Sequence, residues 1–107
     1  MINPHEHLQF IADNVEKFAK ADQELTASES WKSAIKAIAM EYSSQTSISG
    51  KEMEAYSSKE YKDWCNSHAK AKKTYTELKL KIELAKLSIE VFRTIEASSR
   101  NADRMLK

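Results

Sequence analysis

Histidine and cysteine are the side chains in this sequence that could ligate a metal, act as a base or act as a nucleophile. The chain has three histidines, His5, His7 and His68, and one cysteine, Cys65. His5 and His7 are two residues apart, so on a helix they would point to different sides. No His-Glu-x-x-His motif or cysteine–histidine cluster is present, and Cys65 has no base at a recognisable spacing. The sequence therefore predicts no metal site, no cofactor and no catalytic residue.

Carboxylates and glycines lead to the same expectation. The 16 Asp and Glu residues are interspersed with lysines in the manner of solvated helical faces, and the single glycine cannot form a phosphate-binding loop. We therefore expect a protein that is not an enzyme and has no small-molecule substrate.

Basic residues are the group that could contact a large ligand. Residues 65–107 carry 10 Lys and Arg against 5 Asp and Glu, whereas residues 1–64 carry 7 against 11. Phosphate contact along the second half would explain this excess, with Tyr75 or Trp64 as stacking groups. The alternative is a solvated face paired with the acidic first half, and the lysines at 70, 72, 73 and 79 do spread over more than one helix face. The residues predicted to contact nucleic acid or a protein partner are Lys70, Lys72, Lys73, Lys79, Arg93, Glu96, Arg100 and Arg104.

The elements that must position these residues are helices. The chain has 107 residues with one Gly and one Pro, which excludes a turn-rich β-sandwich, and 41% hydrophobic residues, which is too many for a disordered chain. No apolar run approaches the roughly 18 residues of a membrane span, and a lone cysteine suits a reducing compartment. We expect a single all-α domain in the cytoplasm, with no membrane contact.

The first helical region is predicted over about residues 4–44. Asn3 can cap it, and Pro4 suits the first helical position. The expected contact positions fall in two runs, Leu8, Ile11, Val15, Phe18 and Leu25, then Trp31, Ile35, Ile38 and Tyr42. The second run is one residue out of phase with the first. Either the region is one continuous or kinked helix whose apolar face shifts around the axis, or Thr26 or Ser28 caps a new helix.

A loop is predicted over residues 45–50, a short helix over 51–56 and a long helix over about 58–104, which a Ser57–Glu60 capping box would begin. Heptad positions in the long helix are filled by Tyr61, Trp64, His68, Ala71, Tyr75, Leu78, Ile82, Ala85, Ile89 and Phe92. Five heptads indicate coiled-coil-like packing. A helix of this length would measure roughly 65–70 Å, so we expect an elongated antiparallel helical hairpin.

The long helix also carries a second apolar stripe, formed by Leu80, Leu84, Leu87, Val91 and Ile95. One partner helix covers one face, so a helix that is apolar on two faces needs a further partner. Either the N-terminal region packs on both sides, or a second copy of the chain covers the stripe. We expect the second arrangement, a dimeric helical bundle with the stripe at the interface.

The second half, about residues 52–105, resembles a group of small helical proteins of phages, prophages and other mobile elements. Three segments carry the likeness: Glu54-Ala-Tyr-Ser-Ser-Lys-Glu-Tyr61, Lys79-Leu-Lys-Ile-Glu-Leu-Ala85 and Ile89-Glu-Val-Phe-Arg-Thr-Ile-Glu-Ala-Ser-Ser-Arg100. The last segment fits the pattern Ile-Glu-x-(Trp/Phe)-Arg-Thr-x-Glu-x-x-x-Arg of that group, with Phe92 where Trp is more usual. The resemblance implies an early-region accessory role near phage recombination and replication genes, in a bacterial host cell.

These expectations lead to three hypotheses of function, all non-catalytic. The first is an accessory of phage DNA recombination or replication that contacts DNA or a protein of that machinery. The second is a small inhibitor of a host defence protein, of the anti-CRISPR or nuclease-inhibitor type. The third is a structural or assembly protein, which the coiled-coil pattern alone supports.

Overall fold

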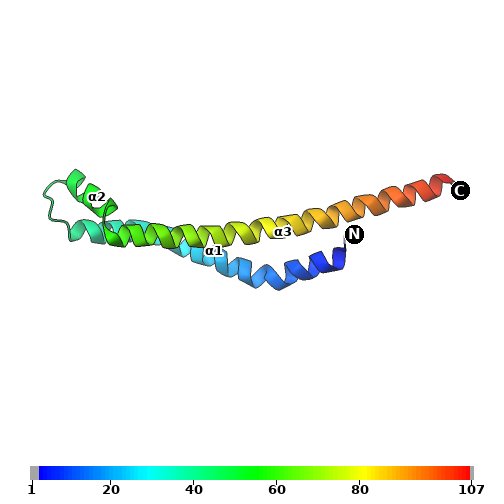
Figure 1. The fold of residues 1–107 in the computed structure, drawn as a ribbon, viewed down its shortest axis with the longest axis horizontal. Coiled ribbons are helices and arrows are strands. Elements are labelled where there is room, and N and C mark those ends of the chain that lie inside the picture. The colour runs from blue at the N-terminus through cyan, green and yellow to red at the C-terminus, as the bar shows by residue number, and fades with distance from the viewer. Residues whose placement is uncertain (1–2, 107) are drawn as a thin grey trace. The chain divides into compact units, whose positions relative to one another are not determined.

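The structure is a computed structural model that describes residues 3–106. Three α-helices follow one another along the chain (Figure 1): α1 (Pro4–Glu41), α2 (Ile48–Tyr56) and α3 (Lys59–Leu106). No strand occurs within residues 3–106. The predicted all-α class is therefore confirmed.

α1 is one uninterrupted helix, so the single-helix alternative for residues 4–44 is the one found. Asn3 lies just before it, and its side-chain Oδ1 accepts a hydrogen bond from the backbone N–H of His5 at 3.0 Å. Thr26 and Ser28 lie inside the helix and do not start a new one. The side chain of Ser28 instead contacts α3, where its Oγ lies 3.0 Å from Nδ1 of His68.

α2 begins earlier than the sequence predicted. Its first residue is Ile48, because Ser47 acts as the N-cap and its Oγ accepts a hydrogen bond from the N–H of Gly50 at 3.0 Å. Gly50 therefore lies in the first turn of a helix, and the prediction of a loop over 45–50 was wrong for its second half. A Cβ at position 50 would lie 3.0 Å from that Oγ and 3.1 Å from the Cβ of Gln45, so a glycine suits this crowded turn.

α3 begins one residue later than predicted, because Ser58 and not Ser57 caps it. The Oγ of Ser58 accepts a hydrogen bond from the N–H of Tyr61 at 3.2 Å and donates one to the carbonyl of Ala55 at 2.6 Å. One hydroxyl thus joins the end of α2 to the start of α3. Ser57 ends α2, and its N–H donates to the carbonyl of Met53 at 3.2 Å.

Replacing Ser58 with Ala should lower the free energy of unfolding by about 1 kcal/mol, since the first turn of α3 loses its side-chain acceptor. Chemical denaturation followed by circular dichroism measures this change. Ser67→Ala is the matched control, because Ser67 lies exposed inside α3 and makes no capping bond. An equal loss in both variants would show that Ser58 does not act as a cap.

Two compact units divide the chain, and both long helices contribute to each. Unit 1 combines the described residues up to Phe18 with those from Glu77 onward, and unit 2 contains Ala19–Thr76. Each candidate surface described below lies within a single unit.

The contact face of α3 is the one that the heptads predicted. All of the predicted heptad positions are buried or half-buried: Tyr61, Trp64, His68, Ala71, Tyr75, Leu78, Ile82, Ala85, Ile89 and Phe92. Ala85 is the most covered of them, with 3% of its surface exposed. Trp64 donates a hydrogen bond from Nε1 to the carbonyl of Ser28 at 2.8 Å, which ties the indole to α1 within unit 2.

The predicted contact face of α1 was partly wrong. Leu8, Val15, Trp31, Ile38 and Tyr42 are all exposed. Most of the covered positions follow one phase along the helix: His7, Ile11, Asn14, Phe18, Ala21, Leu25, Ser28, Ile35 and Ala39. Phe10, Ala34, Lys36 and Met40 beside this phase are also half-buried. This phase places the small side chain of Ser28 beside the rings of Trp64 and His68 of α3.

Candidate functional site

The potential metal ligands and nucleophiles are scattered. Among residues 3–106, no group of three or more His, Cys, Asp or Glu side chains could hold a metal ion. His68 lies on the contact face of α3 in unit 2, half-buried, with its ring stacked on Trp64 at 4.8 Å between centroids. Cys65 is exposed. His68 therefore packs against its neighbours. The described residues do not bring Cys65 or the other histidines together with further metal ligands.

The aromatic side chains near the start of α3 contact one another in a row. Tyr56 meets Tyr61 edge-on at 5.1 Å between centroids, and Tyr61 lies 5.6 Å from Trp64. At the Tyr56 end, Nζ of Lys36 lies 4.8 Å from the ring centroid and 3.7 Å from Oε1 of Glu52. The hydrogen bond to Tyr56 is the main reason why the pKa of Lys36 is raised. The row holds unit 2 together, so its tyrosines act as scaffold.

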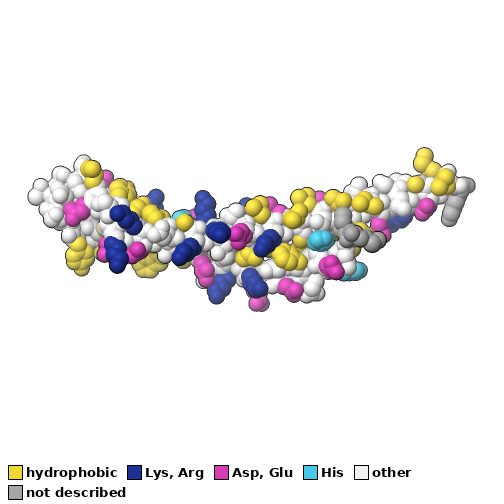
Figure 2. Space-filling view, viewed as in Figure 1, with side chains coloured by type: hydrophobic (Ala, Val, Ile, Leu, Met, Phe, Trp, Pro, Cys, Tyr) yellow, Lys and Arg dark blue, Asp and Glu magenta, His cyan; other side chains and the backbone are white. Residues whose placement is uncertain are grey.

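The apolar stripe of α3 is uncovered within unit 1. Its members Leu80, Leu84, Leu87, Val91 and Ile95 expose between 47% and 65% of their surface. Hydrophobic side chains recur at the surface along this stretch of α3 in Figure 2. Five half-exposed aliphatic side chains on one helix face form a larger apolar surface than scattered single residues do, and surfaces of this kind are typical of interaction sites.

A groove extends this stripe towards α1 within unit 1. Phe10 and His7 lie on one side of it, Leu84, Lys81 and Ser88 lie on the other, and the nearly buried Ala85 also lines it. Its volume is about 380 Å³. The small side chain of Ala85 leaves room beside Phe10 and Leu84 for an apolar side chain of a neighbouring molecule.

The basic residues that the sequence singled out are exposed but do not form one cluster. Lys70, Lys72 and Lys73 lie in unit 2, and their spacing turns them towards different sides of α3. The others lie in unit 1: Lys79, Arg93, Glu96, Arg100 and Arg104. Arg100 and Arg104 come together with Ala97 and Asn101 around a shallow groove of about 150 Å³.

A regular line of basic side chains was missed by the sequence reasoning. Lys79, Lys86, Arg93 and Arg100 follow one another at intervals of seven residues, and all four are exposed in unit 1. We call these four residues the basic line. None of them forms an ion pair within the described part of the chain. Lys72 and Lys107 continue the same spacing in the sequence, so a search at the heptad period would have found the line.

Comparisons with known proteins give no relative for this chain: no family model, curated protein or solved structure matches it. In residues 3–106, no helical stretch combines the length and the apolarity that a bilayer crossing would need.

Proposed function

We propose that this chain is a non-catalytic protein that binds a macromolecule and that serves as an accessory of phage DNA recombination or replication. In this proposal α1 and α3 form an antiparallel hairpin, two copies associate through the apolar stripe, and the basic line contacts DNA phosphates. The basic line is the observation that carries the proposal.

The chemistry of the basic line suits a polyanion. Residues seven apart on an α-helix are separated by about 10.5 Å along the axis and lie nearly above one another. Each step of seven residues is offset by about 20° around the axis, so the four side chains present a gently winding row of cations. No carboxylate lies within ion-pair distance of them in the described residues. Arg93 and Arg100 add planar guanidinium groups, which bind phosphate oxygens with two bonds at once.

The basic line and the apolar stripe can act at the same time. Lys79 is followed by Leu80, and Lys86 is followed by Leu87, so each basic residue is turned by about 100° around the helix axis from its apolar neighbour. Covering the stripe with a second copy would leave the lysines and arginines accessible. Two copies would then present two basic lines, which raises the affinity for one DNA molecule by multivalency.

Wild-type protein is expected to bind a 30-base-pair duplex at low salt, and a plot of log affinity against log salt should have a slope of about −3 to −4 per chain if all four cations contact phosphates. The double variant Lys86→Glu, Arg93→Glu should bind about tenfold more weakly or worse, because two contacts become repulsions. Fluorescence anisotropy of a labelled duplex, titrated from 50 to 200 mM salt, measures both quantities.

Lys17→Glu with Lys32→Glu is the matched control for this experiment. It makes the same change of charge at two exposed lysines of α1, outside the basic line. Equal weakening by both double variants would show that net charge, and not the basic line, determines binding. A wild-type chain that does not bind the duplex at 50 mM salt would contradict the DNA proposal.

The inhibitor of a host defence protein stays as a second candidate because of one observation. In unit 2, exposed aromatic and aliphatic side chains accompany carboxylates, a combination that suits a basic protein surface better than DNA. Pull-down from bacterial lysate, with and without nuclease treatment, separates the two candidates, because only a protein partner survives removal of nucleic acid.

A further inference from the structure

An apolar face of α1 is left open in unit 2. Trp31, Ile38 and Tyr42 expose 59%, 51% and 83% of their surface. Their spacings of seven and four residues place them on one side of the helix. None of these three side chains has a hydrogen bond or a ring contact within the described residues, so they do not support the fold as the row from Tyr56 to His68 does.

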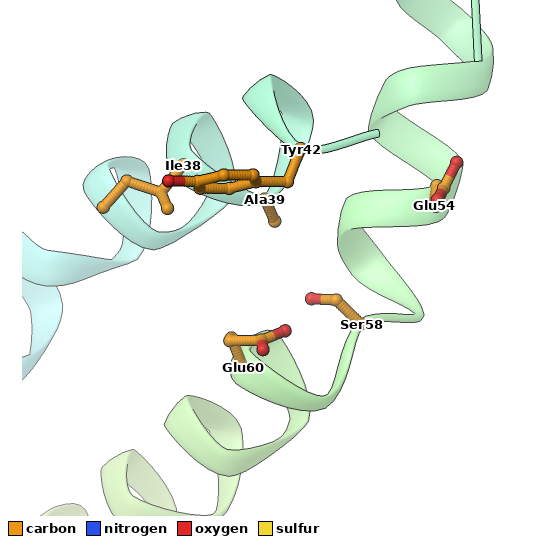
Figure 3. Close-up of a pocket in the computed structure, with 6 residues that line it drawn as sticks. All are labelled: Ile38, Ala39, Tyr42, Glu54, Ser58 and Glu60. Carbon is orange, nitrogen blue, oxygen red and sulfur yellow. The ribbon is translucent and has the colours of Figure 1, made fainter. Parts of the chain in front are cut away.

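A pocket of about 310 Å³ lies beside this face, where the three helices meet in unit 2. Ile38, Ala39 and Tyr42 form the α1 wall, and Ser58 and Glu60 rise from the start of α3 on the opposite wall, as Figure 3 shows. The ring of Tyr42 lies alongside Ile38 at this wall (Figure 3). Glu54 of α2 completes the lining.

The pocket carries negative charge and no cation. Glu54 is partly occupied by its own chain, since its Oε2 accepts hydrogen bonds from Oγ of Ser43 at 2.7 Å and of Ser44 at 3.5 Å. The side chain of Glu60 is exposed, and its carboxylate has no hydrogen bond or ion pair within the described residues. No lysine or arginine lines the pocket.

An aliphatic wall, an open tyrosine ring and a free carboxylate are the three features that recognise a lysine or arginine side chain. The alkyl stem packs on Ile38, the charged head meets the ring of Tyr42, and the carboxylate of Glu60 accepts its hydrogen bonds. Phosphates would be repelled by the same carboxylates, so this face does not suit nucleic acid. Trp31, two turns of α1 away from Ile38, extends the apolar surface beyond the pocket and gives it the length of a helix-binding face.

We propose that this face of unit 2 docks a basic amphipathic helix of a partner protein, with one lysine or arginine in the pocket and apolar side chains on Trp31, Ile38 and Tyr42. The occupant follows from charge complementarity, because the pocket offers carboxylates and apolar surface together. The proposal goes beyond DNA contact by α3, and it stands or falls independently of the basic line.

The test uses the full chain and two synthetic 21-residue helical peptides. Both peptides carry leucines on one side, flanked by lysine and arginine in the first peptide and by glutamate in the second. Isothermal titration calorimetry should show at least tenfold tighter binding of the basic peptide. Glu60→Lys and Tyr42→Ala should each weaken that binding at least fivefold, and Glu16→Lys, an equal change of charge at an exposed site in unit 1, should leave it unchanged.

Thermal unfolding of each variant shows whether a loss of binding comes from misfolding, and Trp31→Ser supplies a third variant at an exposed position. Wild-type affinity in all three variants, or no preference for the basic peptide, would overturn the proposal. A second copy of the chain is the occupant instead if Tyr42→Ala, and not Leu87→Glu, abolishes self-association in light scattering. Failure of the chain to bind DNA would leave the proposal intact.

Discussion

Leu87→Glu should prevent the proposed self-association and leave single, folded chains. In the isolated chain 57% of the surface of Leu87 is exposed, so a carboxylate there is solvated. At an interface between two apolar stripes the same carboxylate would be buried without a partner, which costs roughly 3–5 kcal/mol. The dissociation constant should therefore rise by at least about a hundredfold. Light scattering at micromolar concentration should show the mass falling from about twice 12.2 kDa to 12.2 kDa.

Val15→Glu is the control for this change. Val15 is also an apolar residue about half exposed in unit 1, but it lies on α1 and outside the stripe. Its substitution should leave the mass unchanged. A wild-type mass of one chain, or dissociation by both variants, would refute the interface.

Leu25→Ala should be the most damaging small change to stability, with a loss of about 2–4 kcal/mol in the free energy of unfolding. Leu25 is 9% exposed, and the other buried apolar residues among those described are the alanines at positions 21, 55 and 85. It is therefore the one large aliphatic side chain of that core. Urea denaturation followed by circular dichroism measures the change, at a fixed protein concentration because the proposed self-association would add to the measured stability.

Val15→Ala serves as the comparison for Leu25→Ala. Because Val15 is exposed, its truncation should cost within about 0.5 kcal/mol. Similar losses at both positions would show that the covered face of α1 is not the one described.

Much of the fold could be predicted from α3 alone. Its heptads run without a glycine or proline, so period and length both indicate one long helix with one contact face. The phase of α1 could not be predicted in the same way. Its apolar residues lie on several faces, and the choice among them depends on the rings opposite, as Ser28 beside Trp64 shows. The cap of α3 lies one residue later than predicted because Ser57 and Ser58 are adjacent and either could start a helix.

Of the three candidate surfaces, the sequence indicated the apolar stripe but neither the basic line nor the open face of α1. The stripe containing Leu87 was recognised from its helical spacing, and its role at an interface stays a prediction. The basic line was missed because lysines were grouped by nearness in the sequence, whereas Lys79 and Arg100 share a face through the seven-residue period. The open face of unit 2 was missed because Trp31 and Ile38 were assigned to the contact face, which left them out of any surface.

The end of α3 lacks tertiary support. From residue 93 to residue 106 every side chain is exposed, so the helix there is held by its own backbone hydrogen bonds. An unsupported helix end of this kind frays in water unless something covers it. A ligand that contacts Arg100 and Arg104 would therefore bind partly by suppressing fraying, and the entropy lost in that ordering offsets some of the contact energy. Helix propensity at the exposed positions just before Arg100, Ser98 and Ser99, would then change the affinity without any contact to the ligand.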